Sequence, residues 1–321
     1  QHHDRGFYGL IGVVAPIFLC AWDAAKVEFN RYLNSDKMES KKPIMKTPIT
    51  YYGGKQKMLS VILPMIPEHS IYVEPFFGGG AVFWAKEPAQ VEFINDINGE
   101  VANFYRVLQT DYDALKREVD QTLHSELMHR EARAIYRSPE GHTPVRRAWA
   151  VWTLSHQSFY AILGSTWKCS MSRSVAGQIQ GRKENFTETY TRRLEHTSIF
   201  SRDALEILRR ADRPTAFHYV DPPYFNSDMG HYGGYTADDF GQLLEVLSEL
   251  KGRFMLSSYP SELLSEFTEA HGWYTVEVEQ QRSAGGGRKI EVLTMNYDPS
   301  AIAEEPQTVI ELEVSASASA A

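Results

Sequence analysis

The stretch best equipped for chemistry is Asp221-Pro222-Pro223-Tyr224, which follows the apolar and aromatic run 216–220. That run predicts a buried strand, and two consecutive prolines cannot continue a sheet ladder, so the strand should end at Asp221. Its tip would present a carboxylate, a backbone carbonyl and a flat ring, a set that can hold an amino group attached to a planar heterocycle. Taken alone, the motif also fits a simple strand-terminating turn.

A second group of residues is rich in glycine, which lets the backbone approach a ligand closely. The expected strand 70–73 runs into Glu74-Pro75-Phe76-Phe77-Gly78-Gly79-Gly80 and then into a helix, the shape of a nucleotide-cofactor loop. The spacing differs from the G-x-G-x-x-G pattern of dinucleotide sites, so a dinucleotide is only the alternative ligand. Upstream, Tyr51-Tyr52-Gly53-Gly54-Lys55 offers paired glycines and a positive charge.

Asp96 follows directly after the next expected strand, 91–95. An acid at the tip of the second strand of such a sheet is placed to accept hydrogen bonds from ribose hydroxyls. The first half of the sheet is therefore predicted to bind an adenosine-like group.

These residues need a sheet to position them, and the alternation of strand and helix patterns along the chain predicts one. Further strands are expected at 196–200 and 253–258, and the strands 273–280 and 290–297 flank a glycine-rich turn as an antiparallel hairpin. The expected helices of this part are 57–66, 203–211, 240–250 and 261–270. Together these elements predict an α/β fold whose sheet has a mostly parallel core.

The middle of the chain is helical in pattern. Downstream of the second strand, apolar residues recur on one helical face, and residues 144–163 read as a further amphipathic helix. That helix carries four aromatic residues, Trp149, Trp152, Phe159 and Tyr160. We expect these rings to pack in a core rather than to stack on bases.

Charge is distributed unevenly along the chain. The net formal charge is −8, yet residues 130–213 contain 15 Lys/Arg against 8 Asp/Glu. A basic segment in an acidic protein predicts one module that meets a polyanion, with a solvated helical face as the alternative. Within it, residues 164–185 read as a recognition loop in which Arg173, Arg182 and Lys183 are candidate DNA contacts.

The two ends of the chain differ in composition from the rest. Residues 1–44 contain an apolar run, 7–22, that is short for a membrane span and lacks the basic region and cleavage site of a signal peptide. We expect 1–44 to be an extension or linker outside the fold, with a membrane anchor as the less favoured alternative, and 301–321 to be a tail. The only cysteines, Cys20 and Cys169, have no metal-ligand spacing, which fits a reducing cytoplasm.

In this combination the chain resembles the Dam-like (D12 class) adenine-specific DNA methyltransferases. Five motifs in order carry the resemblance: Tyr51-Tyr52-Gly53-Gly54-Lys55, Glu74-Pro75-Phe76-Phe77-Gly78-Gly79-Gly80, Asp96-Ile97-Asn98, Asp221-Pro222-Pro223-Tyr224 and Glu291-Val292-Leu293-Thr294-Met295-Asn296-Tyr297. The resemblance implies a class I S-adenosylmethionine-dependent methyltransferase fold, with a Rossmann-like sheet, a terminal antiparallel hairpin and a mostly helical target-recognition insert. The implied domains are a catalytic part, 45–110 and 196–300, and the insert, 111–195.

The same resemblance implies a reaction and roles for the site residues. The reaction is transfer of a methyl group from S-adenosylmethionine to N6 of a flipped-out adenine at a specific DNA sequence, without a metal. The implied cofactor-binding residues are Tyr51, Gly54, Lys55, Glu74, Phe77, Gly78, Gly79, Gly80, Asp96 and Asp221. The implied catalytic residues are Asp221, Pro222, Pro223 and Tyr224. Among these, Asp221 and the Pro222 carbonyl would accept hydrogen bonds from N6, while Tyr224 stacks on the base.

Several alternatives stay open at this point. Methylation of RNA or of a glutamine side chain would use the same fold, and a non-catalytic DNA-binding relative would keep the insert without the reaction. Relatives often have an Asn-rich segment where this chain has residues 155–161, which leaves the target sequence and the preference for duplex DNA undetermined. The expected partner is DNA, with no metal and no membrane. The expected state is a monomer or weak dimer, with room for a separate restriction endonuclease.

Overall fold

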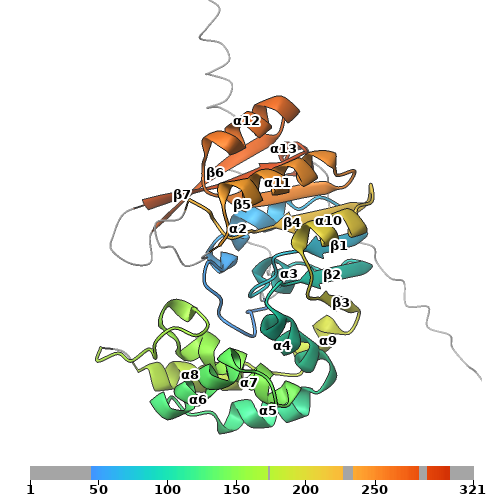
Figure 1. The fold of residues 1–321 in the computed structure, drawn as a ribbon. Coiled ribbons are helices and arrows are strands. Elements are labelled where there is room, and N and C mark those ends of the chain that lie inside the picture. The colour runs from blue at the N-terminus through green and yellow to red at the C-terminus, as the bar shows by residue number, and fades with distance from the viewer. Residues whose placement is uncertain (1–44, 173, 227–233, 282–287, 304–321) are drawn as a thin grey trace, which may run out of the picture. The chain divides into compact units, whose positions relative to one another are not determined.

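The strands predicted from the sequence lie side by side in one seven-stranded sheet (Figure 1), in the order β3-β2-β1-β4-β5-β7-β6. The computed structural model describes residues 45–303, apart from 173, 227–233 and 282–287. The predictions for 1–44 and for almost all of the tail 301–321 lie outside the described residues. The strands are β1 (Ile71–Glu74), β2 (Val91–Asn95), β3 (Thr197–Phe200), β4 (Ala216–Val220), β5 (Arg253–Ser258), β6 (Tyr274–Gln281) and β7 (Arg288–Met295).

The pairing of these strands confirms the predicted sheet. β1 pairs in parallel with β2 on one side and with β4 on the other. β3 and β5 extend the parallel part outward, and β7 lies antiparallel between β5 and β6. The strand order therefore reverses between β1 and β4, and ligands of open α/β sheets bind at such a point, beyond the carboxyl ends of the strands.

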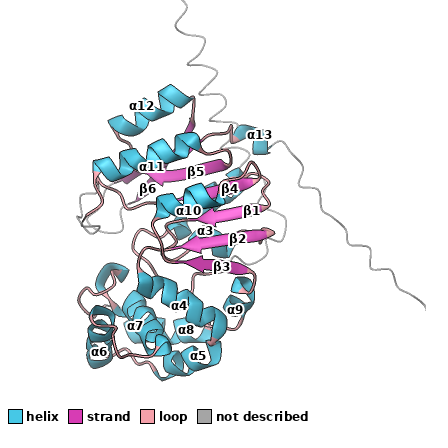
Figure 2. Ribbon diagram, turned by 45° about the vertical axis from the view of Figure 1, so that its right-hand side comes forward, coloured by secondary structure: helices cyan, strands magenta, loops and turns pink. Residues whose placement is uncertain are grey.

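Three helices, α10 (Ala204–Ala211), α11 (Ala237–Glu249) and α12 (Glu262–His271), cover one face of the sheet (Figure 2). Their apolar sides form a buried cluster with β4 and β5 that includes Leu208, Leu244 and Phe254. A capping box between Thr236 and Asp239 begins α11, and Gly272 in the left-handed region ends α12. Local sequence thus fixes where these helices start and stop.

The predicted helix 57–66 is present only as short pieces. They are η1 (Lys55–Lys57), α2 (Leu59–Ile62) and η2 (Leu63–Met65). Pro64 lies at the start of η2, and proline is tolerated there because that position needs no intrahelical N–H. Two further short helices are α3 (Ala81–Ala85), after the glycine-rich loop, and α13 (Ser300–Ala303).

The middle of the chain forms the expected set of helices. They are α4 (Gly99–Thr110), α5 (Tyr112–Gln121), α6 (Glu126–Arg137), α7 (Pro144–Gln157), the turn η3 (Phe159–Ala161), α8 (Val175–Glu184) and α9 (Thr189–Leu194). The prediction of a loop over 164–185 is wrong for α8, whose N-cap is the Ser174 side chain. Because Gly177 and Gly181 interrupt its pattern, only Val175 and Ile179 mark a buried side.

The expectation for the four aromatic residues of this region is half right. Trp149 and Trp152 are fully buried in the helical core, as predicted. The helix ends at Gln157, however, and Phe159 and Tyr160 are 50% and 38% exposed. Tyr160 and Ala161 have positive φ values, 55° and 58°, and this left-handed backbone turns the chain away from the helical core.

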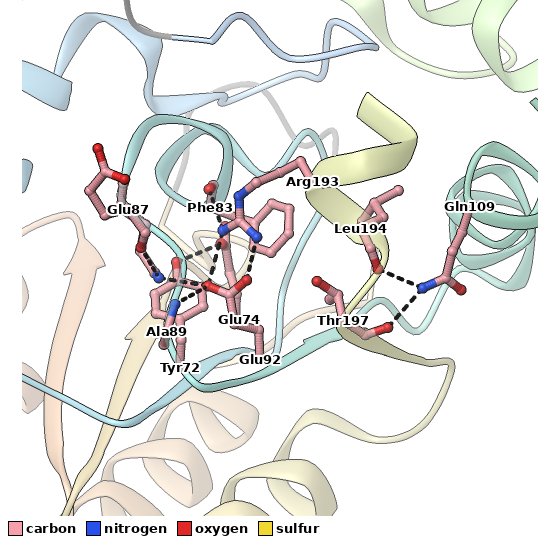
Figure 3. Close-up of polar contacts among 11 residues, drawn as sticks. Tyr72, Glu74, Phe83, Glu87, Ala89, Glu92, Gln109, Arg193, Leu194 and Thr197 are labelled. Carbon is pink, nitrogen blue, oxygen red and sulfur yellow. Dashed lines mark hydrogen bonds and ion pairs between the residues drawn. The ribbon is translucent and has the colours of Figure 1, made fainter. Parts of the chain in front are cut away.

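Buried polar contacts tie the helical region to the sheet (Figure 3). Arg193 of α9 forms ion pairs with Glu92 of β2 and donates to the Phe83 carbonyl of α3 at 3.0 Å. Gln109 of α4 donates to the carbonyls of Leu194 and Thr197 at 2.7 and 2.9 Å. The contacts fix the first and last helices of this region against the β2–β3 side of the sheet.

Candidate active site

A large cavity of about 1910 Å³ opens beyond the carboxyl ends of β1, β2 and β4. Its lining includes every cofactor and catalytic residue expected from the sequence, namely Tyr51, Gly54, Lys55, Glu74, Phe77, Gly78, Gly79, Gly80, Asp96, Asp221, Pro222, Pro223 and Tyr224. The four motifs that contribute these residues are far apart in the chain. The strand order brings them to one edge of the sheet.

Asp221 and Tyr224 lie at the tip of β4, whose five residues are all buried. The Tyr224 hydroxyl donates to Asp221 Oδ1 at 3.2 Å and shares a hydrogen bond with the Ser257 hydroxyl of β5 at 2.9 Å. The Tyr224 ring meets Tyr259 edge-on, with centroids 4.5 Å apart. These contacts hold the ring in one orientation beside the carboxylate.

Lys55, at the start of η1, is the cation of this site. Its Nζ lies 2.8 Å from Asp221 Oδ1 and 4.0 Å from Glu291 Oε2, and it donates to the Gly53 carbonyl at 2.9 Å. Burial alone lowers the pKa of Lys55, but the carboxylates of Asp221 and Glu291 outweigh it and raise that pKa above its usual value. Lys55 therefore stays charged and cannot act as a base.

Asp221, beyond β4, and Glu74, at the end of β1, both carry raised pKa values. Burial raises the pKa of Asp221, and Lys55 opposes the shift. Burial likewise raises the pKa of Glu74 to about 8, although Glu74 accepts a 2.7 Å hydrogen bond from the Tyr72 hydroxyl. Near neutral pH, Glu74 is therefore largely protonated and can donate as well as accept.

The glycine-rich loop has room only for glycine at two positions. Gly78 has φ 47° and Gly80 has φ 65°. A Cβ at Gly78 would lie 2.8 Å from the Tyr51 ring, and a Cβ at Gly80 would lie 2.3 Å from the Phe77 ring. The loop thus packs directly against Tyr51, which joins the first two motifs into one wall of the cavity.

Asp96 closes the other side of this wall. Its carboxylate accepts from the backbone N–H groups of Gly78 at 2.8 Å and Asn98 at 2.9 Å. Burial raises the pKa of Asp96 to about 6 in spite of these two hydrogen bonds. The carboxylate is therefore held rigidly at the end of β2 and ionised at neutral pH.

Other cavity residues were not predicted as site residues from the sequence. Ile97 is 73% exposed and lines the cavity beside Asp96, and Asp203 and Leu205 line it beyond the end of β3. An exposed apolar side chain beside a half-buried acid offers a contact surface for a planar ring. Ile97 follows Asp96 in the motif Asp96-Ile97-Asn98, and this position could have identified it as a cavity residue. Asp203 gave no signal beyond its place before a helix.

The candidate DNA contacts fall in three different places. Arg182 of α8 lines the cavity. Lys183 instead donates to the Thr122 carbonyl at 3.0 Å, which ties α8 to the end of α5, and Arg173 lies outside the described residues. The exposed rings of Phe159 and Tyr160 also line the cavity, so this wall combines aromatic and basic side chains.

The described part of the chain lacks two features that other classes of protein would need. No group of three or more His, Cys, Asp or Glu side chains in it is arranged to hold a metal ion. No helix among the same residues is long and apolar enough to cross a membrane. The apolar run 7–22 lies outside the described residues.

Comparison with known proteins gives a consistent set of matches. Residues 51–283 match the family model of the D12 class N6 adenine-specific DNA methyltransferases. The chain is 27% identical over 273 residues to the type II methyltransferase M1.LlaDCHI of Lactococcus lactis subsp. cremoris, covering 76% of this chain and 93% of that protein. It is 23% identical over 274 residues to the DNA adenine methylase of Escherichia coli (strain K12), covering 79% and 96%.

A shorter match has higher identity. The chain is 35% identical over 81 residues to the modification methylase StsI of Streptococcus sanguinis, which covers 25% of this chain and 12% of that protein. The match to the family model, in contrast, spans the glycine-rich loop, Asp96 and the tip of β4. It therefore covers most of the motifs that line the cavity.

Proposed function

The chain belongs to the D12 class of N6 adenine-specific DNA methyltransferases, and on that basis we propose that it methylates N6 of adenine at a specific DNA sequence, with S-adenosylmethionine as the donor. One observation carries the proposal. The Asp221–Tyr224 tip and the glycine-rich loop with Asp96 line the same cavity. A site that holds an amino group therefore lies beside a site suited to an adenosine-like group.

The cofactor side of the cavity fits S-adenosylmethionine on two grounds. Gly78 and Gly80 pack against the rings of Tyr51 and Phe77 with no room for a Cβ, so bare backbone of this loop lines the cavity where the cofactor would lie. Asp96 is ionised at neutral pH and lies where ribose hydroxyls would donate to it. We assign Tyr51, Gly54, Lys55, Glu74, Phe77 and Gly79 to the same side of the site.

The acceptor side fits an adenine that has left the helix stack. Flipping a base costs roughly a few kcal/mol, which stacking and hydrogen bonds in the pocket must offset. The Tyr224 ring, fixed by Ser257 and Tyr259, supplies the stacking surface. The Asp221 carboxylate and the Pro222 carbonyl supply two acceptors for the N6 hydrogens. With both hydrogens held, the N6 lone pair faces the methyl donor.

S-adenosylmethionine supplies a methyl group carried on a sulfonium. The chain contributes orientation and charge: Asp221 and Pro222 hold the amino group, and Lys55 keeps Asp221 in place at 2.8 Å. As N6 becomes positively charged on methylation, the nearby Asp221 carboxylate stabilises that charge. No strong base is needed beforehand, because N6 can lose its proton after the attack.

The helices from α5 to α9 belong to the proposed target-recognition part of the protein. We propose 111–195 as this insert and 45–110 with 196–300 as the catalytic part. The insert contributes Arg182, Phe159 and Tyr160 to the lining of the cavity. Basic groups suit the phosphate backbone and exposed rings suit unstacked bases. Relatives include modification methylases, so we also propose that the protein acts alongside a separate restriction endonuclease.

The proposal is tested by transfer of labelled methyl groups from S-adenosylmethionine to mixed-sequence DNA. We expect label at adenine N6, concentrated at one short sequence, and none with Asp221→Ala. Glu279→Gln is the matched control, because it removes a carboxylate of the exposed Arg288–Glu279 pair on the same sheet. Cofactor binding without transfer to DNA would contradict the proposal, and label in RNA alone would replace the acceptor.

A further inference from the structure

Glu291 of β7 begins the motif 291–297, to which the proposed reaction assigns no role. Its side chain is 2% exposed and lines the same cavity as Asp221. Oε1 pairs with Lys289. Oε2 lies 4.0 Å from Lys55 Nζ and accepts no hydrogen bond from any described residue. A buried carboxylate oxygen without a hydrogen bond is costly, so its retention calls for an explanation.

The charges around Glu291 alternate in sign. Asp221, Lys55, Glu291 and Lys289 form a row that leads from the tip of β4 to the hairpin, where the Lys289 side chain is 28% exposed. Lys55 is therefore shared between two carboxylates, and the nearer one belongs to the proposed acceptor site. If either carboxylate were removed, the other would interact alone with the Lys55 ammonium.

We propose that Glu291 is a positioning residue that acts through Lys55, holding part of its charge so that the Asp221 carboxylate stays free to take the proton released from N6. This inference rests on the proposed function. In the step, the N6–methyl bond forms as the sulfur–methyl bond breaks, leaving a neutral thioether and a positively charged N6. An N6–H bond then breaks, its electron pair returns to N6, and the proton moves to Asp221 and from there to water.

The arrangement predicts a pH dependence with a definite sign. The groups that face Asp221 are Lys55 of η1, Glu291 of β7, Tyr224 beyond β4, Tyr219 of β4 and Glu74 of β1. Of these, Glu291 raises the pKa of Asp221 and Lys55 lowers it. A neutral residue at 291 removes the first effect and strengthens the second. The pKa of Asp221 then falls, and Asp221 becomes a weaker proton acceptor.

Two variants with opposite expected shifts test this inference. Glu291→Gln should move the acid limb of the single-turnover methyl-transfer rate to lower pH by roughly one unit and reduce the plateau rate roughly tenfold. Lys289→Gln removes the other partner of Glu291, so it should move the limb to higher pH. Glu279→Gln, the exposed control on β6, should leave the limb in place. DNA affinity, measured by fluorescence anisotropy, should change less than about twofold in Glu291→Gln, because Glu291 is only 2% exposed and acts on Asp221 through Lys55.

The outcomes separate the inference from the proposed function. If the acid limbs of the pH–rate profiles coincide in wild type, Glu291→Gln and Lys289→Gln, the inference is wrong, while the proposed methyl transfer still holds. A loss of rate in Glu291→Gln that matches a loss of DNA affinity would also overturn it. If Glu291→Gln does not fold, the upward shift in Lys289→Gln still decides. A wild-type protein that transfers no methyl group to DNA would instead contradict the proposed function.

Discussion

Two buried clusters of carboxylates and cations lie in the same sheet, and they are built differently. At β2, Glu92 accepts from Lys86 Nζ at 2.7 Å, from the Ala89 N–H at 3.1 Å and from both Nη atoms of Arg193. At the tip of β4, Asp221 pairs with Lys55 and accepts from Tyr224, and beside it Glu291 keeps one oxygen without a hydrogen bond. Both oxygens of Glu92 therefore accept hydrogen bonds, whereas Oε2 of Glu291 accepts none from any described residue.

The pKa values of Glu92 and Asp221 shift in opposite directions. Burial works to raise the pKa of Glu92, yet the hydrogen bonds and charges of Arg193 and Lys86 outweigh it and lower that pKa. For Asp221, burial prevails over Lys55 and the pKa rises. A buried carboxylate with both oxygens hydrogen-bonded stabilises the fold, whereas one with an oxygen to spare keeps acceptor capacity for a ligand. The difference agrees with the proposed site and does not depend on any motif.

Replacing Asp221 should give the largest effect on activity. Asp221→Asn keeps the shape of the side chain but removes the charge that stabilises N6 in the transition state, so the methyl-transfer rate should fall roughly 10³-fold. The free energy of unfolding should change by less than about 1 kcal/mol, because the Lys55 ammonium keeps a second carboxylate, that of Glu291, as a partner. Single-turnover kinetics and urea denaturation measure the two quantities. A variant with near wild-type rate would remove Asp221 from the mechanism.

Replacing Glu92 should give the converse result. Glu92→Gln leaves the buried charges of Lys86 and Arg193 facing a neutral amide, and breaking a buried pair costs about 3 kcal/mol or more. Folded protein should nevertheless transfer methyl groups at the wild-type rate, since Glu92 does not line the cavity. Urea denaturation with parallel kinetics at low temperature would test this. If the rate fell and the stability did not, the contrast between the two clusters would be wrong.

Local patterns in the sequence predicted the position of Asp221 in one cluster and gave no sign of Glu92 in the other. The apolar run before Pro222 and Pro223 marked β4, and with it the position of Asp221. Nothing local marked Glu92, whose partner Arg193 lies 101 residues away in the chain. The approach of Glu291 to Lys55 likewise follows from the order β4-β5-β7, which brings β7 beside the acceptor site. Contacts that depend on the order of strands in the sheet cannot be predicted from the spacing of residues in the sequence.

The helical region shows a second limit of sequence patterns. Trp149 and Trp152 lie on a regular helix, so their periodicity predicted burial correctly. Phe159 and Tyr160 continue the same apolar pattern, but the left-handed turn at Tyr160 and Ala161 places them at the cavity. Such backbone angles in residues other than glycine are held by tertiary contacts. The apolar pattern therefore predicted burial in the helical core for Phe159 and Tyr160, which was wrong.

Asp96 is intermediate between the two clusters and gives the smallest expected effect. Its carboxylate accepts two backbone N–H groups, yet burial raises its pKa to about 6. Below that pH the free protein carries a protonated carboxyl, which loses acceptor capacity toward ribose hydroxyls. Cofactor binding favours the ionised form, so the affinity for S-adenosylmethionine should weaken severalfold as the pH falls through about 6.

Isothermal titration of the protein with S-adenosylmethionine between about pH 5 and pH 7 measures this effect. Asp96→Asn is the control: it should bind more weakly throughout and show no change across this range, because an amide does not titrate there. The two curves should differ most above the pKa of Asp96, where only the wild type carries the charge. A wild-type curve as flat as that of Asp96→Asn would show that the carboxylate is not in contact with the ribose. Asp96 would then belong with Glu92, as an acid that serves the fold.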